Sequence, residues 1–588
     1  MNCMNFKKLI LTAFLFVTAT FSLFAQNPSF STNNTKMNQL LHAINELYTD
    51  TVDFNLIIEK GVVEMLKELD PHSVYIPVKE VQQANEPLEG AFDGIGVTFQ
   101  LIKDTINIIE VLIGGPSEKV GLLPGDKIIK VDTADATGKD ITNRWVQTHL
   151  RGEKGTKVHL LIKRGNKPEP LEFTITRGKI PIHSINVSFM VDQQTGYIRL
   201  ERFAKDTPDE FKTAITKLKA RGMKNLIFDL RGNGGGYLDA AFKISDEFIK
   251  DKQLIVFTDN HRKERQDFIA TSAGNFEKGK LIILIDEGSA SASEIVSGAV
   301  QDWDRGLVVG RRTFGKGLVQ RPLPLVDKSQ VRLTTSQYYT PTGRCIQKPF
   351  KDGAEAYYQD LNNRYRHGEY LTADSISFPD SLKYYTPNKR TVYGGGGIMP
   401  DIFIPYDTTK YSTLHNELMR KGVFGGFTAS YMDNHREELK AQYPTIEEFK
   451  KGFQITEELY NQLMEYAHNE GVKDEAEFNL SARIANFAKD KKSEIDSLFT
   501  KMGDVDKDSQ LEKMLAEYIK DSYNETLRLR NPEKAPGFIK EALTFEIARN
   551  LYSFGEAYQI YLINDETFQQ AVKLIQDEKI FKQFKVAY

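Results

Sequence analysis

The chain has 588 residues, more than one hydrophobic core usually organises, so we expect several domains. Hydrophobic residues make up 40% and charged residues 27%, which is ordinary for a soluble globular protein. The formal net charge of −3 shows no basic excess, so we expect no nucleic-acid partner.

The first 25 residues have the layout of a secretory signal peptide. Lys7 and Lys8 form a short basic start, an apolar run follows over residues 9–24, and Ala25 is a candidate cleavage residue. The run is short for a membrane span, which needs about 20 apolar residues. We expect cleavage, export to the periplasm or cell envelope, and no membrane span in the mature chain; an uncleaved anchor is the alternative.

Residues 31–85 are predicted to form a helical segment. Apolar residues recur at helical spacing, namely Leu40, Leu41, Ile44, Leu47, Tyr48, Ile57, Val62, Val63, Leu66 and Leu69. Asp70-Pro71 ends the pattern. We expect this segment to serve in packing or in contact between copies of a homo-oligomer, and we expect His72, just beyond it, to be structural.

Residues 86–179 are predicted to form short strands with glycine turns. Gly94, Ile95, Gly96 and Val97 enter a strand, and flanking glycines let successive amides converge on a terminal carboxylate. Together with GLLPGDKII at 121–129, a helix over 142–150 and RGEKGT at 151–156, this stretch resembles a PDZ module of the circularly permuted bacterial kind. The alternative is a β-barrel domain without a ligand.

Residues 180–406 alternate strands and helices, which predicts an α/β core with its site at strand ends. The expected strands cover 196–200, 225–230 and 281–285, and the expected helices cover 208–220 and 238–249. The glycine loop at 231–236 follows a strand. Its spacing is not that of a phosphate loop, and an oxyanion hole is the alternative.

A second strand-to-helix turn has the sequence GSASASEI, residues 288–295. Small residues clear space around a serine hydroxyl, and a helix N-terminus favours negative charge. The alternative is helix capping, because serine followed three residues later by glutamate forms a capping box. Ser289, Ser291 and Ser293 cannot all be nucleophiles, so at least two have other roles.

A nucleophilic serine needs a base, and no histidine lies between His261 and His367. A lysine serves instead where burial lowers its pKa. Lys316 lies between two glycines in TFGKGLVQ, residues 313–320, beside apolar residues. A surface turn is the alternative for this segment.

Together these motifs resemble the carboxyl-terminal processing peptidases, or tail-specific proteases. The matching segments, in the family's order, are GIGV, GLLPGD, DLRGNGGG (229–236), SASASEI (289–295), FGKG (314–317), LTTSQYYTPTGRCIQ (333–347) and GGIMPD (396–401). The resemblance implies a multidomain α/β fold with a helical N-terminal segment, a PDZ-like β-rich module, a crotonase/ClpP-like protease core and a helical C-terminal domain.

The resemblance also implies roles for residues. Ser291 would be the nucleophile, Lys316 the base and Gln320 the residue that holds the lysine. Gly235, or a neighbouring glycine, and Ala292 would donate their amides to the oxyanion. Substrates would be proteins or peptides with apolar carboxyl termini, and neither a metal nor another cofactor would be needed.

Residues 407–588 are predicted to be a helical C-terminal domain from periodicity around 455–467, 511–518 and 568–575. The sequence is also compatible with two other functions. One is a non-catalytic peptide-binding scaffold, and the other is a carrier of apolar ligands on the same fold. A scaffold or a carrier would not need the pattern formed by Ser291, Lys316 and Gln320, so this pattern argues against both functions.

Overall fold

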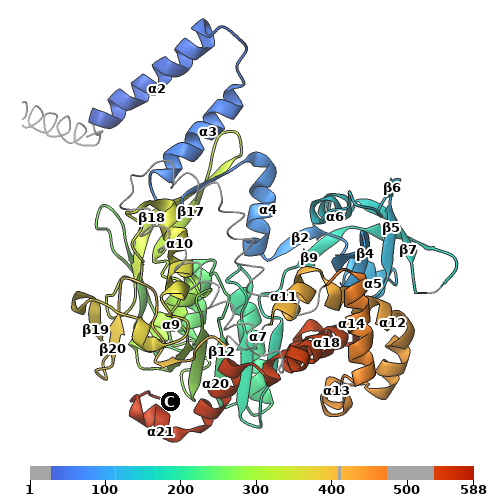
Figure 1. The fold of residues 1–588 in the computed structure, drawn as a ribbon. Coiled ribbons are helices and arrows are strands. Elements are labelled where there is room, and N and C mark those ends of the chain that lie inside the picture. Colours follow the sequence, from blue (N-terminus) through green and yellow to red (C-terminus); the bar gives the residue numbers. More distant parts are fainter. Residues whose placement is uncertain (1–27, 113, 166, 408–411, 473–534) are drawn as a thin grey trace, which may run out of the picture. The chain divides into compact units, whose positions relative to one another are not determined.

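The computed structural model describes residues 28–112, 114–165, 167–407, 412–472 and 535–588 (Figure 1). They belong to two compact units, Met1–Leu69 and Asp70–Tyr588. The predicted signal peptide and the helical pattern at 511–518 lie outside the described residues. Within those residues, no helix is both long and apolar enough to cross a membrane.

The first unit contains helices α2 (Pro28–Leu47) and α3 (Phe54–Lys67), as the apolar spacing predicts. Asp53 caps α3, since its Oδ1 accepts hydrogen bonds from the amides of Asn55 and Leu56 at 3.0 and 3.2 Å. Several apolar side chains of the two helices are exposed: Met37, Leu40, Leu47, Leu56, Ile57, Ile58 and Met65. Contact between copies through them stays a prediction.

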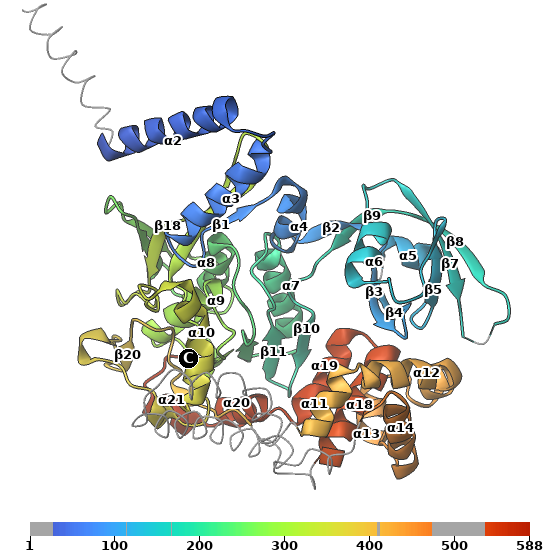
Figure 2. The same ribbon diagram turned by 45° about the horizontal axis from the view of Figure 1, so that its top comes forward.

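The PDZ module is a small antiparallel sheet with two helices (Figure 2). Its strands, in spatial order, are β3 (Val97–Ile102), β4 (Thr105–Val111), β5 (Lys127–Val131), β7 (Lys157–Lys163) and β8 (Leu171–Thr176), with β6 (Ala134–Asp135) beside β5. The helices are α5 (Pro116–Lys119) and α6 (Asn143–Leu150). Alternate residues of β7 face the core, so Val158, Leu160 and Ile162 are buried.

Two antiparallel strands, β2 (Ala91–Gly94) and β9 (Gly178–Pro181), pair at the point where the chain enters and leaves the module. Helix α4 (Val78–Glu89) precedes β2 and ends at Gly90, whose φ of 74° is left-handed, a conformation that glycine adopts without strain. The chain therefore leaves α4 directly into the β2–β9 pair.

The α/β core is built on a six-stranded sheet. Its order is β10 (Val187–Met190), β11 (Thr195–Arg199), β12 (Asn225–Asp229), β15 (Leu281–Ile285), β16 (Leu307–Gly310) and β21 (Ile402–Phe403). All neighbours run parallel except β10 and β11. The carboxyl ends of the parallel strands therefore meet at one edge, where sites of such sheets lie.

Both faces of this sheet are covered, which explains the continuous apolar run of β15, buried along its whole length. Leu281, Ile283 and Ile285 pack into the cluster that includes α7 (Thr207–Ala220), α8 (Leu238–Asp246) and α9 (Ala292–Asp302). Ile282 and Leu284 pack on the other face, against α20 (Glu566–Gln576) and α21 (Glu578–Gln583). The side chains thus alternate between two cores.

A second sheet completes the core. It contains β1 (Val74–Ile76), β18 (Gln330–Tyr339), β13 (Leu254–Asp259) and β14 (Gln266–Ile269), with β17 (Leu318–Pro324) paired to β18. Beside it lie α10 (Gly353–Arg366), two 3₁₀ turns (Ala373–Ser375 and Asp380–Leu382) and the pair β19 (Lys383–Tyr385) and β20 (Thr391–Tyr393). The β17–β18 hairpin follows the predicted lysine loop directly.

The described part of the C-terminal region divides between two hydrophobic clusters. One comprises α11 (Thr413–Arg420), α12 (Val423–Gln442), α13 (Ile446–Gly452), α14 (Glu457–Asn469), α18 (Ala535–Leu551) and the start of α19 (Phe554–Ile563). The other is the sheet face under α20 and α21. The sequence pattern predicts one helical domain over 407–588, but the packing places its last helices, α20 and α21, against the sheet of the α/β core.

Candidate active site

The predicted nucleophile lies in a strained turn between β15 and α9. Ser291 has φ 55° and ψ −111°, which is unusual for a residue other than glycine. Its amide donates to Glu294 Oε2 at 2.8 Å, and the two residues form a capping box at the start of α9. A serine hydroxyl that accepts a hydrogen bond in such a box keeps its own proton to donate.

The neighbouring serines have structural partners. Ser289 Oγ donates to Leu230 O at 2.8 Å, and Ser293 Oγ donates to Asn233 O at 2.8 Å. Both side chains are fully buried. These bonds tie the serine turn to the glycine loop and single out Ser291 as the serine without such a role.

The glycine loop packs directly on the predicted nucleophile. A Cβ on Gly235 would lie 2.9 Å from both Ala292 N and Ser291 Cβ, and the φ of Gly235 is 101°. Any side chain there would cover the Ala292 amide, so glycine is required. The Gly235 amide itself donates to Asn233 Oδ1 at 2.9 Å. This bond favours a neighbouring glycine as the second oxyanion donor, the alternative that the sequence left open.

Lys316 lies in the loop before β17, and burial lowers the pKa of its ammonium. The negative charges of Asp70 and Glu294 partly oppose this effect, and the positive charge of Arg332 adds to it. Lys316 Nζ donates to Gln320 Oε1 at 2.9 Å, the contact predicted for this pair. Gln320 Nε2 in turn donates to His72 O, which orients the amide.

Sequence reasoning missed the role of Glu294 beyond capping. Its fully buried carboxylate accepts hydrogen bonds from Thr313 Oγ1, from Gly315 N at 2.8 Å and from Lys316 N at 2.9 Å, besides the Ser291 amide. Burial raises the pKa of this carboxyl, and these hydrogen bonds oppose the rise. One carboxylate therefore holds the backbone of both predicted catalytic residues.

Two further residues near the pair are not predicted from the sequence to take part in the site. The hydroxyl of Tyr338, a buried residue of β18, lies 3.0 Å from Ser291 O and 2.9 Å from Lys316 O and donates to them. His72 is 2.8 Å from the Tyr357 hydroxyl through Nε2. Burial, followed by the charge of Lys316, lowers the pKa of His72 to about 4. His72 is therefore neutral near pH 7, in keeping with a structural role.

The predicted catalytic residues line one cavity of about 320 Å³. It contains Ser291, Ala292, Lys316, Gln320 and Gly235. Apolar walls come from Leu88, Leu238, Ile295, Leu318, Val319 and Pro322. The charged side chains in this lining, Lys316 and Arg332, are both basic. The cavity thus joins a hydroxyl, a buried amine and glycine amides, the groups that acyl transfer requires.

The PDZ module has a cavity of its own, about 260 Å³, between β3 and α6. Ile95, Gly96 and Val97 line it, opposite Val146 and Leu150. Gly94 is not in this lining and instead pairs with Gly178 in the β2–β9 ladder. The structure therefore brings three of the four predicted substrate-binding residues to one groove.

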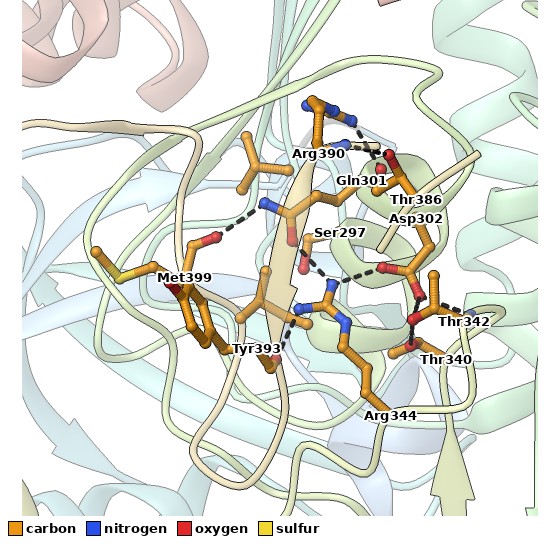
Figure 3. A network of polar contacts seen from close by, with 12 residues as sticks. Ser297, Gln301, Asp302, Thr340, Thr342, Arg344, Thr386, Arg390, Tyr393 and Met399 are labelled. Atoms are coloured by element: carbon orange, nitrogen blue, oxygen red, sulfur yellow. Dashed lines mark hydrogen bonds and ion pairs between the residues drawn. The ribbon is translucent and has the colours of Figure 1, made fainter. Parts of the chain in front are cut away.

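A buried ionic network holds the far end of α9 (Figure 3). Arg344, with no exposed surface, donates to Asp302 Oδ1 at 2.7 Å and to Gln301 Oε1 at 2.8 Å. Asp302 Oδ2 also accepts from the Thr342 hydroxyl at 2.7 Å. Helix α9 is thus fixed at both ends, by Glu294 beside Ser291 and by Arg344 at the last turn.

Replacing Asp302 with alanine is expected to lower the free energy of unfolding by about 3–5 kcal/mol, because it leaves the Arg344 guanidinium buried without its counter-charge. Urea denaturation measures the change. The control is Asp239→Ala in α8, which removes an exposed pair with Lys243 and should cost less than about 1 kcal/mol. Equal losses in the two variants would contradict an anchoring role for the network.

Comparison with known proteins agrees with this geometry. Residues 194–355 match Peptidase family S41, residues 94–175 match the PDZ domain, and residues 414–488 match a family of unknown function, DUF8443. A PDZ domain placed before an S41 core defines a serine-type peptidase, a hydrolase.

Sequence relatives identify the family more closely. The chain is 32% identical over 353 residues to the carboxy-terminal-processing protease of Bartonella bacilliformis, covering 58% of this chain and 80% of that one. It is 32% identical over 317 residues to carboxy-terminal processing protease CtpB of Bacillus subtilis, covering 53% and 65%. A probable CtpA-like serine protease of Staphylococcus haemolyticus is 33% identical over 354 residues, covering 59% and 70%. The chain belongs to the carboxy-terminal processing proteases, which confirms the resemblance predicted from its motifs.

Proposed function

We propose that the protein is an exported endopeptidase in which Ser291 is the nucleophile and Lys316 the general base. The observation that carries this proposal is the shared carboxylate of Glu294, which holds the backbone of both residues at the wall of one cavity. Ser291 lies in a strained turn there, and burial lowers the pKa of Lys316. A serine hydroxyl and a lysine with a lowered pKa in the same cavity are the groups that a serine–lysine peptidase needs.

In the proposed mechanism, neutral Lys316 takes the proton of Ser291 Oγ while that oxygen attacks the peptide carbonyl. Gln320 holds the amine, and Ala292 N with a glycine amide of the 234–236 loop stabilises the oxyanion. Lys316 then gives the proton to the leaving amine. Water, activated by the same lysine, releases the acyl group from Ser291.

The experiment that tests this assignment uses a fluorophosphonate probe and a casein assay on the purified protein. Mass spectrometry should find the label on Ser291, and Ser291→Ala should lose both label and casein hydrolysis. A scaffold or a carrier of apolar ligands would neither react nor hydrolyse casein. A label on another serine would overturn the assignment of the nucleophile.

Export rests on the first 25 residues, with Lys7 and Lys8 ahead of the apolar run. We propose a periplasmic or cell-envelope location for the mature chain. Amino-terminal sequencing of protein recovered from the envelope fraction tests it, and a mature start after Ala25 is the expected result. An intact start at Met1 would contradict cleavage.

The rate of hydrolysis is expected to rise with pH through the lowered pKa of Lys316, because only the neutral amine accepts a proton. Arg332→Gln removes a positive charge that disfavours the ammonium, so the pKa of Lys316 should increase and the rise should move to higher pH. A pH profile of kcat/KM measures the shift. Arg321→Gln, an exposed arginine on the same hairpin, should leave the profile in place. A flat profile with rate-limiting chemistry would count against a lysine base.

The PDZ groove is proposed to bind the apolar carboxyl terminus of a substrate as an added strand beside β3. One reporter protein is prepared with a free apolar tail, with the same tail amidated, and with a charged residue added. Cleavage of the last two should slow on the order of tenfold, about 1.4 kcal/mol of lost binding. A short peptide without such a tail, the control, should be cleaved independently of the module. Equal rates for all three tails would contradict tail capture.

A further inference from the structure

The side chain of Arg231 connects the glycine loop to the last part of the chain. Arg231 lies two residues after the end of β12, and its side chain lies between two carboxylates. Its Nη2 donates to Asp229 Oδ2 at 2.7 Å, and its Nη1 donates to both oxygens of Asp565 at 2.8 and 3.0 Å. The Arg231 side chain is only 12% exposed, so these charges interact with little screening by solvent.

The carboxylate of Asp565 is held in place by the helix that follows it. Asp565 Oδ1 caps α20 by accepting a hydrogen bond from Phe568 N at 2.7 Å. Phe568 packs edge-on against the ring of Tyr197 in β11, with ring centroids 5.2 Å apart. Helix α20 lies against β12 and β15 (Figure 1). Asp565 is therefore attached, through α20, to the sheet of the core.

Hydrogen bonds continue from Arg231 to the nucleophile turn. Gly232 N donates to Asp286 Oδ1 at 2.8 Å. The carbonyl of Asn233 accepts from Ala290 N at 3.0 Å, directly before Ser291. A displacement of Arg231 would thus move the loop that packs on Ser291 and Ala292. Small displacements of such groups cost much activity, since about 1 Å of misplacement can lower a rate by 10².

We propose that Asp565 is a positioning residue of the active site, acting through Arg231 on the glycine loop. The C-terminal region then contributes a positioning residue to the catalytic centre. The inference rests on the proposed role of the glycine loop in stabilising the oxyanion. The alternative is that Asp565 has a structural role only, as the N-terminal cap of α20.

The variant Asp565→Asn separates the two roles, because asparagine caps helices about as well as aspartate but carries no charge. We expect kcat on an unstructured peptide to fall about tenfold to a hundredfold, with KM unchanged and the protein folded by circular dichroism. The matched control is Asp577→Asn, since Asp577 caps α21 by accepting from Lys579 N at 2.8 Å. This control should keep the wild-type kcat.

A double-mutant cycle tests the route through Arg231. In the background of Arg231→Met, adding Asp565→Asn should lower kcat no further, because the guanidinium it acts on is gone. A second pair, Asp565→Glu and Asp565→Gln, differs in charge but not in size, and the glutamate variant should be faster. Hydrogen exchange at residues 232–235 should be faster in folded Asp565→Asn than in the wild type.

Wild-type kcat in Asp565→Asn, the same loss in both backgrounds, or equal rates for the glutamate and glutamine variants would overturn the proposal. A wrong assignment of Ser291 and Lys316 would give a different experimental result. Ser291→Ala would then retain hydrolysis, while the Asp565 comparisons would still be read from the peptidase activity of the same protein.

Discussion

Lys316→Ala is expected to lower kcat on the order of 10⁴-fold or more, the usual scale for loss of a member of a nucleophile–base pair. Without the amine, the one charged side chain left in the cavity lining is that of Arg332, which has no lone pair to take the proton of Ser291. Lys316→Arg should fail as well, because a guanidinium does not deprotonate in proteins. Single-turnover hydrolysis of a fluorogenic peptide, alongside circular dichroism, separates lost chemistry from lost folding.

The control for this experiment is Lys351→Ala, which removes an exposed lysine outside the cavity lining and should leave kcat unchanged. Substantial hydrolysis by Lys316→Ala would show that the base is another residue. His72 is the group to replace next, since its pKa of about 4 keeps it neutral and it interacts with the charge of Lys316. Retained activity in Lys316→Ala that disappears in a His72→Ala background would identify the histidine as the base.

Ordered local motifs predict much of this site. The strand over 281–285, the serine turn and the lysine loop each have a pattern within about ten residues, and the structure places them around one cavity. The shared role of Glu294 is invisible at that scale. Its partners Gly315 and Lys316 lie 21 and 22 residues away, and a capping box explains Glu294 in the sequence without them.

The contribution of the C-terminal region escapes prediction for a similar reason. Asp565 reaches Arg231 across 334 residues, and helical periodicity at 568–575 shows only that a helix has an apolar face. It does not show which surface covers that face. The alternation of buried residues in β15 requires a second layer of cover, but only the folded structure identifies α20 and α21 as that layer.

Glu294→Gln is expected to lower both stability and activity, because four donors converge on a carboxylate that the amide replaces only in part. The carboxylate accepts the amides of Ser291, Gly315 and Lys316 and the hydroxyl of Thr313. Glutamine offers one acceptor oxygen and turns an NH₂ donor toward the remaining donors. Each buried donor left unsatisfied costs about 1–3 kcal/mol, so the free energy of unfolding should fall by about 2–5 kcal/mol.

The matched control for Glu294 is Glu448→Gln in α13. This substitution changes an exposed capping box but no buried hydrogen bonds to a second loop. Glu448 Oε2 accepts from Thr445 N at 3.0 Å, the same contact that Glu294 makes with Ser291. Its loss should cost less than about 1 kcal/mol. We further expect Glu294→Gln, assayed at a temperature where it is folded, to react with the fluorophosphonate more slowly than the wild type, because the Ser291 and Lys316 backbones are no longer held by one group. A Glu294→Gln protein with wild-type labelling and a stability loss no greater than that of Glu448→Gln would reduce Glu294 to an ordinary helix cap.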